Sequence, residues 1–590
     1  MSRSLFRTKQ LDSILKDADN TTEGHGLRRI LSLRDLTFFG IAAVIGAGSF
    51  SSLGSAVFSG GPGVVLLFII TAIACAFTAL CYSEFASRIP VAGSAYTYAY
   101  ASFGELFAWI IGWALIMEYS IGNIYVSFSW SDYFTSFLDK TGDSLGMNLH
   151  IPDYLSNSYP EVKKAITSGN ANNEMQYAWT HAPQLNGFRI ILDLPAFLIN
   201  VFITFLVYRG VKESRNFSNV MVVLKLAVVL IVILVGGYLI FANHLTTNWL
   251  PVNSSGTQSF MPNGFSGVMR AVAGVFFAYI GFDAVSVLAE ESKNPQRDLP
   301  RGMILSLFIC TIVYILLALV LSGAVHYSLF EGVGDPLAFI FEKQNLNIGW
   351  MQFLVSICAV IAMTSVLLVF QMGQPRIWMS MSRDGLLPPV FQTIHKKYKT
   401  PSFSTIATGF VVGLPILFTD KTFVLDFTSI ATLFAFVLVC GGVLLIPRKE
   451  RIAGKFHLPY INSRYLFPIL VLITAILIFS LNPNYLKDLL TFDYSSNEAY
   501  TQGHITFMDA ATPAISLLIF WISTLILAIN AFRKNYSLIP LLGLVTCMYL
   551  LTGMTKSNWI WFIGWMLIGL VVYFLYGYKK SKLSVRNSSL

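Results

Sequence analysis

The chain has 590 residues, of which 55% are hydrophobic and only 12% are charged. Soluble domains average about 25% charged residues, so this composition excludes an ordinary soluble protein. The net charge of +9 does not indicate a nucleic-acid-binding face, because the cations lie in short links between apolar runs. That arrangement is typical of a multi-pass membrane protein, so we expect membrane lipids as partners and no nucleic acid.

The first 35 residues are polar, and they show no cleavable signal peptide. Leu11, Ile14 and Leu15 have helical spacing within this segment. Such spacing fits a short helix on the inner membrane surface, and a solvated tail is an equally good interpretation.

Fourteen apolar stretches follow, and each is near the length of about 20 residues that a membrane-spanning helix needs. Their approximate ranges are 36–58, 64–88, 104–134, 188–208, 218–242, 265–290, 302–325, 348–380, 403–419, 424–446, 464–481, 511–531, 537–552 and 558–578. We expect three parts: a cytoplasmic segment 1–35, a ten-helix core 36–448, and four further helices with a tail over 449–590.

The charges of the links predict the orientation of these helices. Lys and Arg are frequent after the fourth, sixth, eighth, tenth and last stretches, whereas the link 243–264 contains neither. Cations are retained on the cytoplasmic side, so both termini should be cytoplasmic in a plasma (inner) membrane protein. The long link 136–187 then lies outside, where it could fold as a small cap. The six cysteines all fall in apolar stretches, which predicts small core residues rather than disulfides.

Two of the predicted spans carry a glycine fault, at Gly46-Ala47-Gly48 and at Ala278-Tyr279-Ile280-Gly281. A helix that breaks inside a membrane leaves free N–H groups on one half and free C=O groups on the other. The N–H groups can hold a carboxylate and the carbonyls an ammonium, so two facing breaks can bind an α-amino acid. A G-x-G pattern alone is weak evidence, because glycines in membrane helices usually permit close packing.

Ionisable residues inside the predicted spans are the other functional signal, because they are costly in lipid. Lys225 lies deep in the fifth span, where desolvation makes its charged form costly, so it could trade protons or tie helices together. Glu118 could pair with a protein cation, meet a cationic substrate or carry a proton. Asp283 fits helix capping as well as gating, and Glu84 is expected to pair with a nearby cation such as Arg88.

Between Leu27 and Arg448 the chain resembles the amino acid–polyamine–organocation (APC) superfamily and, within it, the cationic amino acid transporter family. The stretches that carry the resemblance are GIAAVIGAGSF, CYSEFASRIPVAGSAYTYAY, GWALIMEYSIG, FFAYIGFDAVSVLAEESKNPQRDLPRGM, QPRIWMSMSRDGLLP and ATLFAFVLVCGGVLL. The later spans match only in number. One departure is in the first break, where many relatives read IGTGIF and this chain has a Ser at position 49.

The resemblance implies an all-α membrane protein with the LeuT-like fold, in which spans 1–5 and 6–10 are inverted repeats and spans 1 and 6 are discontinuous. It implies that Ile45, Gly46, Ala47 and Gly48 bind the substrate carboxylate. Carbonyls of Phe277, Ala278 and Ile280 would bind the amine. It further implies that Phe277 closes over the substrate, with Asp283 in gating. Lys225 would couple transport to protons, while Glu118 and Met363 would face the pocket.

The expected function is therefore a secondary active amino acid permease with proton-coupled uptake by alternating access. An amino acid exchanger and a non-transporting nutrient sensor are the alternatives. No cofactor, metal or enzymatic activity is expected, because no His pair has metal-type spacing and no nucleophile has a base at catalytic spacing. Whether the substrate is cationic or small and neutral depends on what Glu118 meets.

Overall fold

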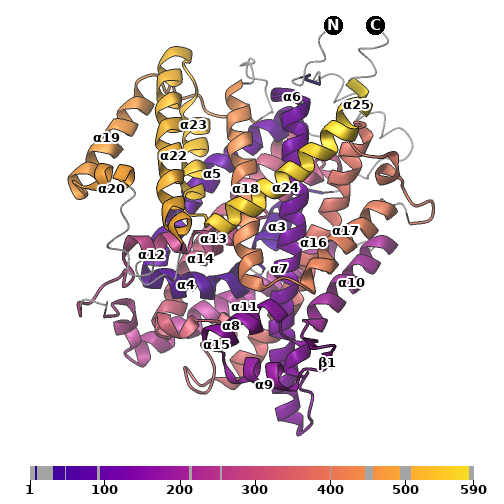
Figure 1. Ribbon diagram of the computed structural model, residues 1–590, viewed down its shortest axis with the longest axis vertical. Coiled ribbons are helices and arrows are strands. Elements are labelled where there is room, and N and C mark those ends of the chain that lie inside the picture. The colour runs from indigo at the N-terminus through magenta and orange to yellow at the C-terminus, as the bar shows by residue number, and fades with distance from the viewer. Residues whose placement is uncertain are drawn as a thin grey trace.

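The computed structural model describes residues 7–9, 31–46, 48–89, 94–169, 171–210, 215–252, 256–398, 400–445, 456–491 and 506–583. Within them the chain is almost entirely helical, with one two-stranded hairpin. Both termini lie at one end of the molecule, and the short elements of the long link lie at the opposite end (Figure 1). We call these ends the terminal side and the cap side.

The first five predicted spans correspond to the first group of helices. These are α3 (Leu33–Val44) with η1 (Gly48–Ser52) and α4 (Leu53–Gly60), α5 (Val64–Arg88), α7 (Glu105–Leu145), α10 (Leu194–Arg209) and α11 (Arg215–Ala242). A short helix, α6 (Ser94–Ser102), links α5 to α7. The first span is broken between Val44 and Gly48, as its glycines predict.

The next five spans repeat this order, again with a broken first member. They are α12 (Gly264–Arg270), α13 (Val272–Tyr279) and η5 (Phe282–Glu291), then α14 (Pro295–Ala324), α16 (Gly349–Arg383), α17 (Ser402–Ile416) and α18 (Lys421–Leu445). Between α14 and α16 lie η6 (Tyr327–Phe330) and α15 (Pro336–Phe339). Gly281 has φ of +116°, a conformation that ordinary side chains rarely adopt, and it interrupts the sixth span where the sequence predicts.

Four more apolar stretches form the last group of helices. They are α19 (Leu466–Leu481), α22 (Phe507–Lys534), α23 (Leu538–Leu551) and α24 (Lys556–Val572), with α20 (Tyr485–Thr491) after α19 and the short η8 (Tyr573–Gly577) and α25 (Tyr578–Lys580) after α24. Helix α23 packs on α5 and α18, and α24 packs on α7 and α18. Helices α19, α22 and α23 share a separate small apolar cluster at the edge of the molecule.

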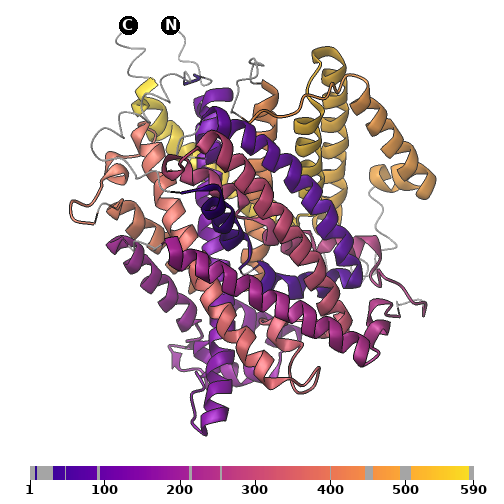
Figure 2. The same cartoon turned by 180° about the vertical axis from the view of Figure 1, so that it is seen from behind.

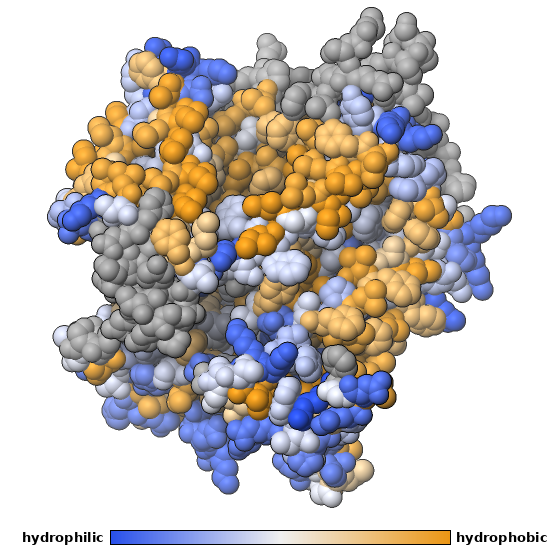
Figure 3. Space-filling view, viewed as in Figure 1, coloured by the Kyte–Doolittle hydropathy of each residue, from blue (hydrophilic) through white to orange (hydrophobic). Residues whose placement is uncertain are grey.

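Eight helical segments of the described chain are long and apolar enough to cross a membrane, or up to ten if each of two bent pairs is one span. One of the eight is the run from Leu33 to Arg88, which contains the first two predicted spans. Three shorter apolar helices accompany them: α10, α17 and α23. The protein is thus a multi-pass integral membrane protein, while the number of fourteen spans stays a prediction. Figure 3 shows hydrophobic residues over a broad belt and hydrophilic residues gathered at the cap side.

Corresponding helices of the two groups of five pack against each other. The first and sixth spans meet, α5 lies on α14, α7 on α16, and α10 on α17. The fifth helix of each group packs on the first helix of its own group and on the second and third helices of the other group. Thus α11 packs on α3, α14 and α16, and α18 packs on α13, α5 and α7. Figure 2 shows α5, α14 and α11 together on the back of the molecule.

The long link folds around its own small core, as expected of a cap. It contains η3 (Asp153–Leu155), α8 (Tyr159–Ser168), α9 (Asn173–His181) and the strands β1 (Gln184–Leu185) and β2 (Phe188–Arg189). Its core residues include Val162, Ala178 and Ile191. The link lies later in the chain than expected, because α7 continues to Leu145 instead of ending near residue 134 and α10 begins at Leu194 instead of near residue 188. Hydropathy marks where apolar residues stop, not where the helix stops.

All six cysteines are buried and unbridged, which agrees with the expectation of small core residues. The segment around Leu11, Ile14 and Leu15 lies outside the described residues, as do Ala47 and the predicted domain boundary near residue 448.

Candidate functional site

The two broken helices cross each other at their breaks. An added Cβ at Gly48 would lie 2.5 Å from the Cα atom of Ala278, and one at Gly281 would lie 3.0 Å from the Cβ and carbonyl carbon of Ala43. Only glycine lets two backbones approach this closely. The two breaks therefore face each other, with two contact points that flank a gap.

Polar side chains from other helices donate to the carbonyls at the C-terminal end of α3, the first half of the broken first span. The Lys225 Nζ atom donates to the carbonyls of Ala42 and Ile45, at 3.3 and 3.4 Å. Tyr314 donates to the carbonyl of Val44 at 2.8 Å. A cation at the C-terminal end of a helix is favourable, because the last carbonyls carry partial negative charge. Lys225 thus lies where a change in its charge acts directly on the first break.

Lys225 also reaches the eighth span. Its ammonium donates to Ser365 Oγ at 2.5 Å, and only 1% of the residue is exposed. One buried amine therefore joins α11, α3 and α16. Ser365 escaped the sequence analysis, since a serine on a membrane helix is common and its pairing with Lys225 depends on the fold.

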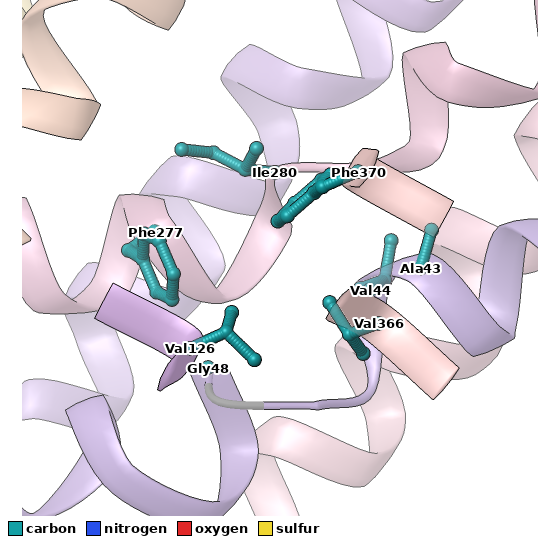
Figure 4. A pocket seen from close by; sticks show the side chains of 8 residues that line it. All are labelled: Ala43, Val44, Gly48, Val126, Phe277, Ile280, Val366 and Phe370. Atoms are coloured by element: carbon teal, nitrogen blue, oxygen red, sulfur yellow. The ribbon is translucent and has the colours of Figure 1, made fainter. Parts of the chain in front are cut away.

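A small cavity lies between the two contact points. Eight residues line it: Ala43, Val44, Gly48, Val126, Phe277, Ile280, Val366 and Phe370. Their side chains surround one gap (Figure 4). Its volume of about 10 Å³ is at the limit for a single water molecule. Among the described residues no ionisable side chain lines it, so its walls suit an apolar group.

The cavity contains some of the predicted site residues and not others. Phe277 lines it and packs edge-on against Tyr125, with ring centroids 4.6 Å apart. Ile45 and Gly46 lie in the break beside it, and an added Cβ at Gly46 would strike Val366. Met363 is fully buried on α16 but is not part of the lining. The carbonyl of Phe277 already accepts the N–H of Ile280, at 3.1 Å.

Ser49, at which the first break departs from the sequence of many relatives, has a local structural role. Its hydroxyl donates to the carbonyl of Gly46 at 3.0 Å inside the break. The same carbonyl also accepts the backbone N–H groups of Ser49 and Phe50, at 3.1 and 3.0 Å, so the hydroxyl adds a further bond to the turn between α3 and η1.

Glu118 is not in the cavity lining. It lies eight residues before Val126 on α7, which is about 12 Å along a helix, and it is 3% exposed. Its electrostatic neighbours are Asp283 and the hydroxyl of Thr432. Its Oε2 atom has no hydrogen-bond partner among the described residues. The structure therefore brings Glu118 to Asp283 rather than to the gap between the breaks.

Asp283 lies at the start of η5, the second half of the broken sixth span, and is 2% exposed. Helix capping and gating both stay predictions for this residue. Glu84 pairs with Arg88 at 2.5 Å, as the sequence predicts, and it also accepts the backbone N–H of Leu458 at 2.7 Å.

Replacing Gly48 by Ala should impair both folding and transport. The new methyl group would lie 2.5 Å from the Cα atom of Ala278, which cannot move aside as the end of a side chain can. Overpacking of this kind costs about 1–3 kcal/mol, so we expect a lower melting temperature and strongly reduced uptake. Gly237→Ala on α11 is the matched control, because an added Cβ there meets nothing within 4 Å. Equal behaviour of the two variants would contradict the close crossing of the breaks.

Comparison with known proteins agrees with this geometry. The amino acid permease family model matches residues 31–501, and the model for the C-terminus of such permeases matches residues 536–581. The chain is 34% identical to the branched-chain amino acid permease BcaP of Bacillus subtilis (strain 168) over 584 residues, covering 99% of this chain and 100% of that protein.

Two further relatives differ in the substrate that their names give. The chain is 38% identical to the methylthioribose transporter of Bacillus subtilis (strain 168) over 463 residues, which covers 78% of this chain and 89% of that protein. It is 28% identical to cationic amino acid transporter 4 of Homo sapiens over 624 residues, with coverage of 98% and 92%. These relatives are transporters rather than enzymes. The chain belongs to the amino acid permease family, within the amino acid–polyamine–organocation superfamily.

Proposed function

We propose that the protein is a secondary active amino acid permease that takes up amino acids with apolar side chains, coupled to protons. The observation that carries the proposal is the apolar cavity that lies between two crossed helix breaks. Free backbone groups at such breaks can bind the carboxylate and amine that every amino acid shares. The cavity walls then select the side chain.

The packing of the ten core helices supports a LeuT-like arrangement of two repeats. Spans 1–5 and 6–10 pack pairwise, and α11 and α18 contact equivalent sets of partners. A two-fold relation between the repeats produces this pattern, and transporters with such repeats bind substrate at the repeat interface. We infer that the terminal side is cytoplasmic, because the cation-rich links follow the even-numbered spans.

The composition of the cavity favours a neutral apolar substrate over a cationic one. Glu118, the acid that could have met a lysine or arginine side chain, is displaced from the cavity toward Asp283. Val126, Val366 and Ile280 instead provide branched aliphatic walls. One relative, matched over its whole length, is named as a branched-chain amino acid permease, which supports isoleucine, leucine and valine as the first substrates to test.

Transport requires the walls to move, because a cavity of about 10 Å³ cannot contain an amino acid. In the proposed cycle Phe277 closes over the substrate, and the first two spans of each repeat rock against the rest. Lys225 gains a proton when the site opens to the outside and loses it when the site opens to the inside. Its charge changes the hydrogen bonds that it makes to the carbonyls at the end of α3.

The experiment that tests this function is uptake of radiolabelled isoleucine into proteoliposomes, with unlabelled competitors. We expect valine and leucine at tenfold excess to abolish most uptake, and arginine to leave most of it intact, because a buried apolar cavity penalises an unpaired charge. Methylthioribose belongs in the competitor set, since one relative is named for it. Competition by arginine or methylthioribose, without competition by valine, would contradict the proposed substrate class.

A further inference from the structure

The cap side of the candidate site is covered by a partly buried network of charged and polar groups, in which the side chains of Lys421 and Asp132 are 19% and 30% exposed. Lys421, the first residue of α18, donates to the carboxylate of Asp132 on α7 and to the carbonyl of Gly334 at 3.4 Å. Gly334 lies in the loop before α15, and its carbonyl also accepts the hydroxyl of Ser51 at 3.3 Å. One ammonium thus joins α7, α18 and the loop, and through Ser51 the second half of the broken first span.

This network lies directly over the cavity. The Lys421 ammonium lies 5.7 Å from the centroid of the Tyr125 ring, and that ring packs at 4.6 Å on Phe277. Tyr125 also donates to Ser51 at 3.3 Å. Val126, the neighbour of Tyr125, lines the cavity. The ion pair and the cavity are therefore separated by one layer of side chains.

The placement of Lys421 is not explained by the stability of its own helix. A cation at a helix N-terminus opposes the helix dipole, and α18 is already capped by Asp420, which accepts the N–H of Phe423 at 2.9 Å. The surroundings of Lys421 are acidic instead. Burial raises the pKa of the Glu161 carboxyl in the cap, with Lys421 opposing, and burial likewise raises the pKa of the Asp335 carboxyl, with Lys140 opposing.

We propose that Lys421 and Asp132 form a latch that keeps the cap side of the cavity closed, and that the latch opens when substrate enters or leaves on that side. The proposal rests on the proposed function, because it treats the cavity as the substrate site. Lys421 and Asp132 are positioning residues: they act through Tyr125 on Phe277 and do not touch the cavity.

Labelling of a cysteine introduced at Val126 tests the latch without measuring transport. The full-length protein is expressed in intact cells and treated with a membrane-impermeant maleimide from outside. The six native cysteines are buried, so the chain without the Val126→Cys substitution gives the background. We expect Asp132→Asn and Lys421→Met each to raise the labelling rate by roughly tenfold, since removing one partner of this half-buried charge pair destabilises the closed arrangement.

Two further variants separate a latch from a general loss of stability. The exchange of charges, Asp132→Lys with Lys421→Asp, should return the labelling rate toward that of the parent. Asp509→Asn removes an ion pair with Lys556 that joins the peripheral helices α22 and α24, and it should leave the rate unchanged.

Two results would overturn the latch. One is an unchanged labelling rate in both single variants, and the other is an equal rise in Asp509→Asn. Failure of isoleucine uptake in the unmutated protein, with labelling as expected, would instead overturn the proposed function and leave the latch standing.

Discussion

Lys225→Ala should abolish accumulation of isoleucine driven by a pH gradient. The ammonium joins α3, α11 and α16 through Ala42, Ile45 and Ser365, so its charge state bears directly on the first break. A gradient of one pH unit supplies about 1.4 kcal/mol, which is a tenfold accumulation for one coupled proton. Without a residue that gains and loses the proton, that tenfold accumulation should fall to equilibration, and exchange of labelled for unlabelled isoleucine should persist.

The matched control for this variant is Tyr314→Phe. Tyr314 binds the same helix end through the carbonyl of Val44, but its hydroxyl stays neutral at physiological pH. The variant should lower the melting temperature and keep the response to pH. Accumulation that responds to the gradient in Lys225→Ala as it does in the unmutated chain would remove Lys225 from proton coupling.

Phe277→Leu should weaken the apparent affinity for isoleucine by roughly tenfold, which corresponds to about 1.4 kcal/mol. Phe277 lines the cavity and packs on Tyr125, so a smaller side chain loses contact with both the substrate and the Tyr125 ring. Its neighbour Phe276 offers a close comparison, because it is fully buried, lies on the same helix and packs on Phe436 with centroids 5.7 Å apart, away from the cavity.

The two phenylalanine variants therefore separate binding from stability. Phe276→Leu should lower the melting temperature by a similar amount, because both changes remove buried aromatic volume. Its KM for isoleucine should stay within about twofold of the parent, since volume-changing substitutions away from a site act mainly on folding. A larger KM effect in Phe276→Leu than in Phe277→Leu would show that the cavity is not the substrate site.

The sequence predicts the helices and both breaks because their signals are local. Gly48 and Gly281 each mark a position where another backbone comes close, Gly46 marks one where the Val366 side chain comes close, and the apolar runs mark the spans. Glu84 and Arg88 lie one turn apart on the same helix, so their ion pair is also local in the sequence.

The less predictable features depend on distant contacts. Glu118 lies on the span that lines the cavity, and only the register of α7 against its neighbours places it beside Asp283. Asp132 and Lys421 look like ordinary charges at span ends, and 289 residues separate them in the chain. The continuation of α7 to Leu145 escapes prediction because a helix outside lipid needs no apolar run.

The most direct test of proton-coupled amino acid uptake is accumulation of labelled isoleucine by proteoliposomes that are acidic outside and alkaline inside. The account predicts that the internal concentration rises above the external one, and that a protonophore abolishes the excess. Uptake that occurs only when amino acid is preloaded inside would contradict the account, because it identifies an exchanger and removes the coupling role of Lys225.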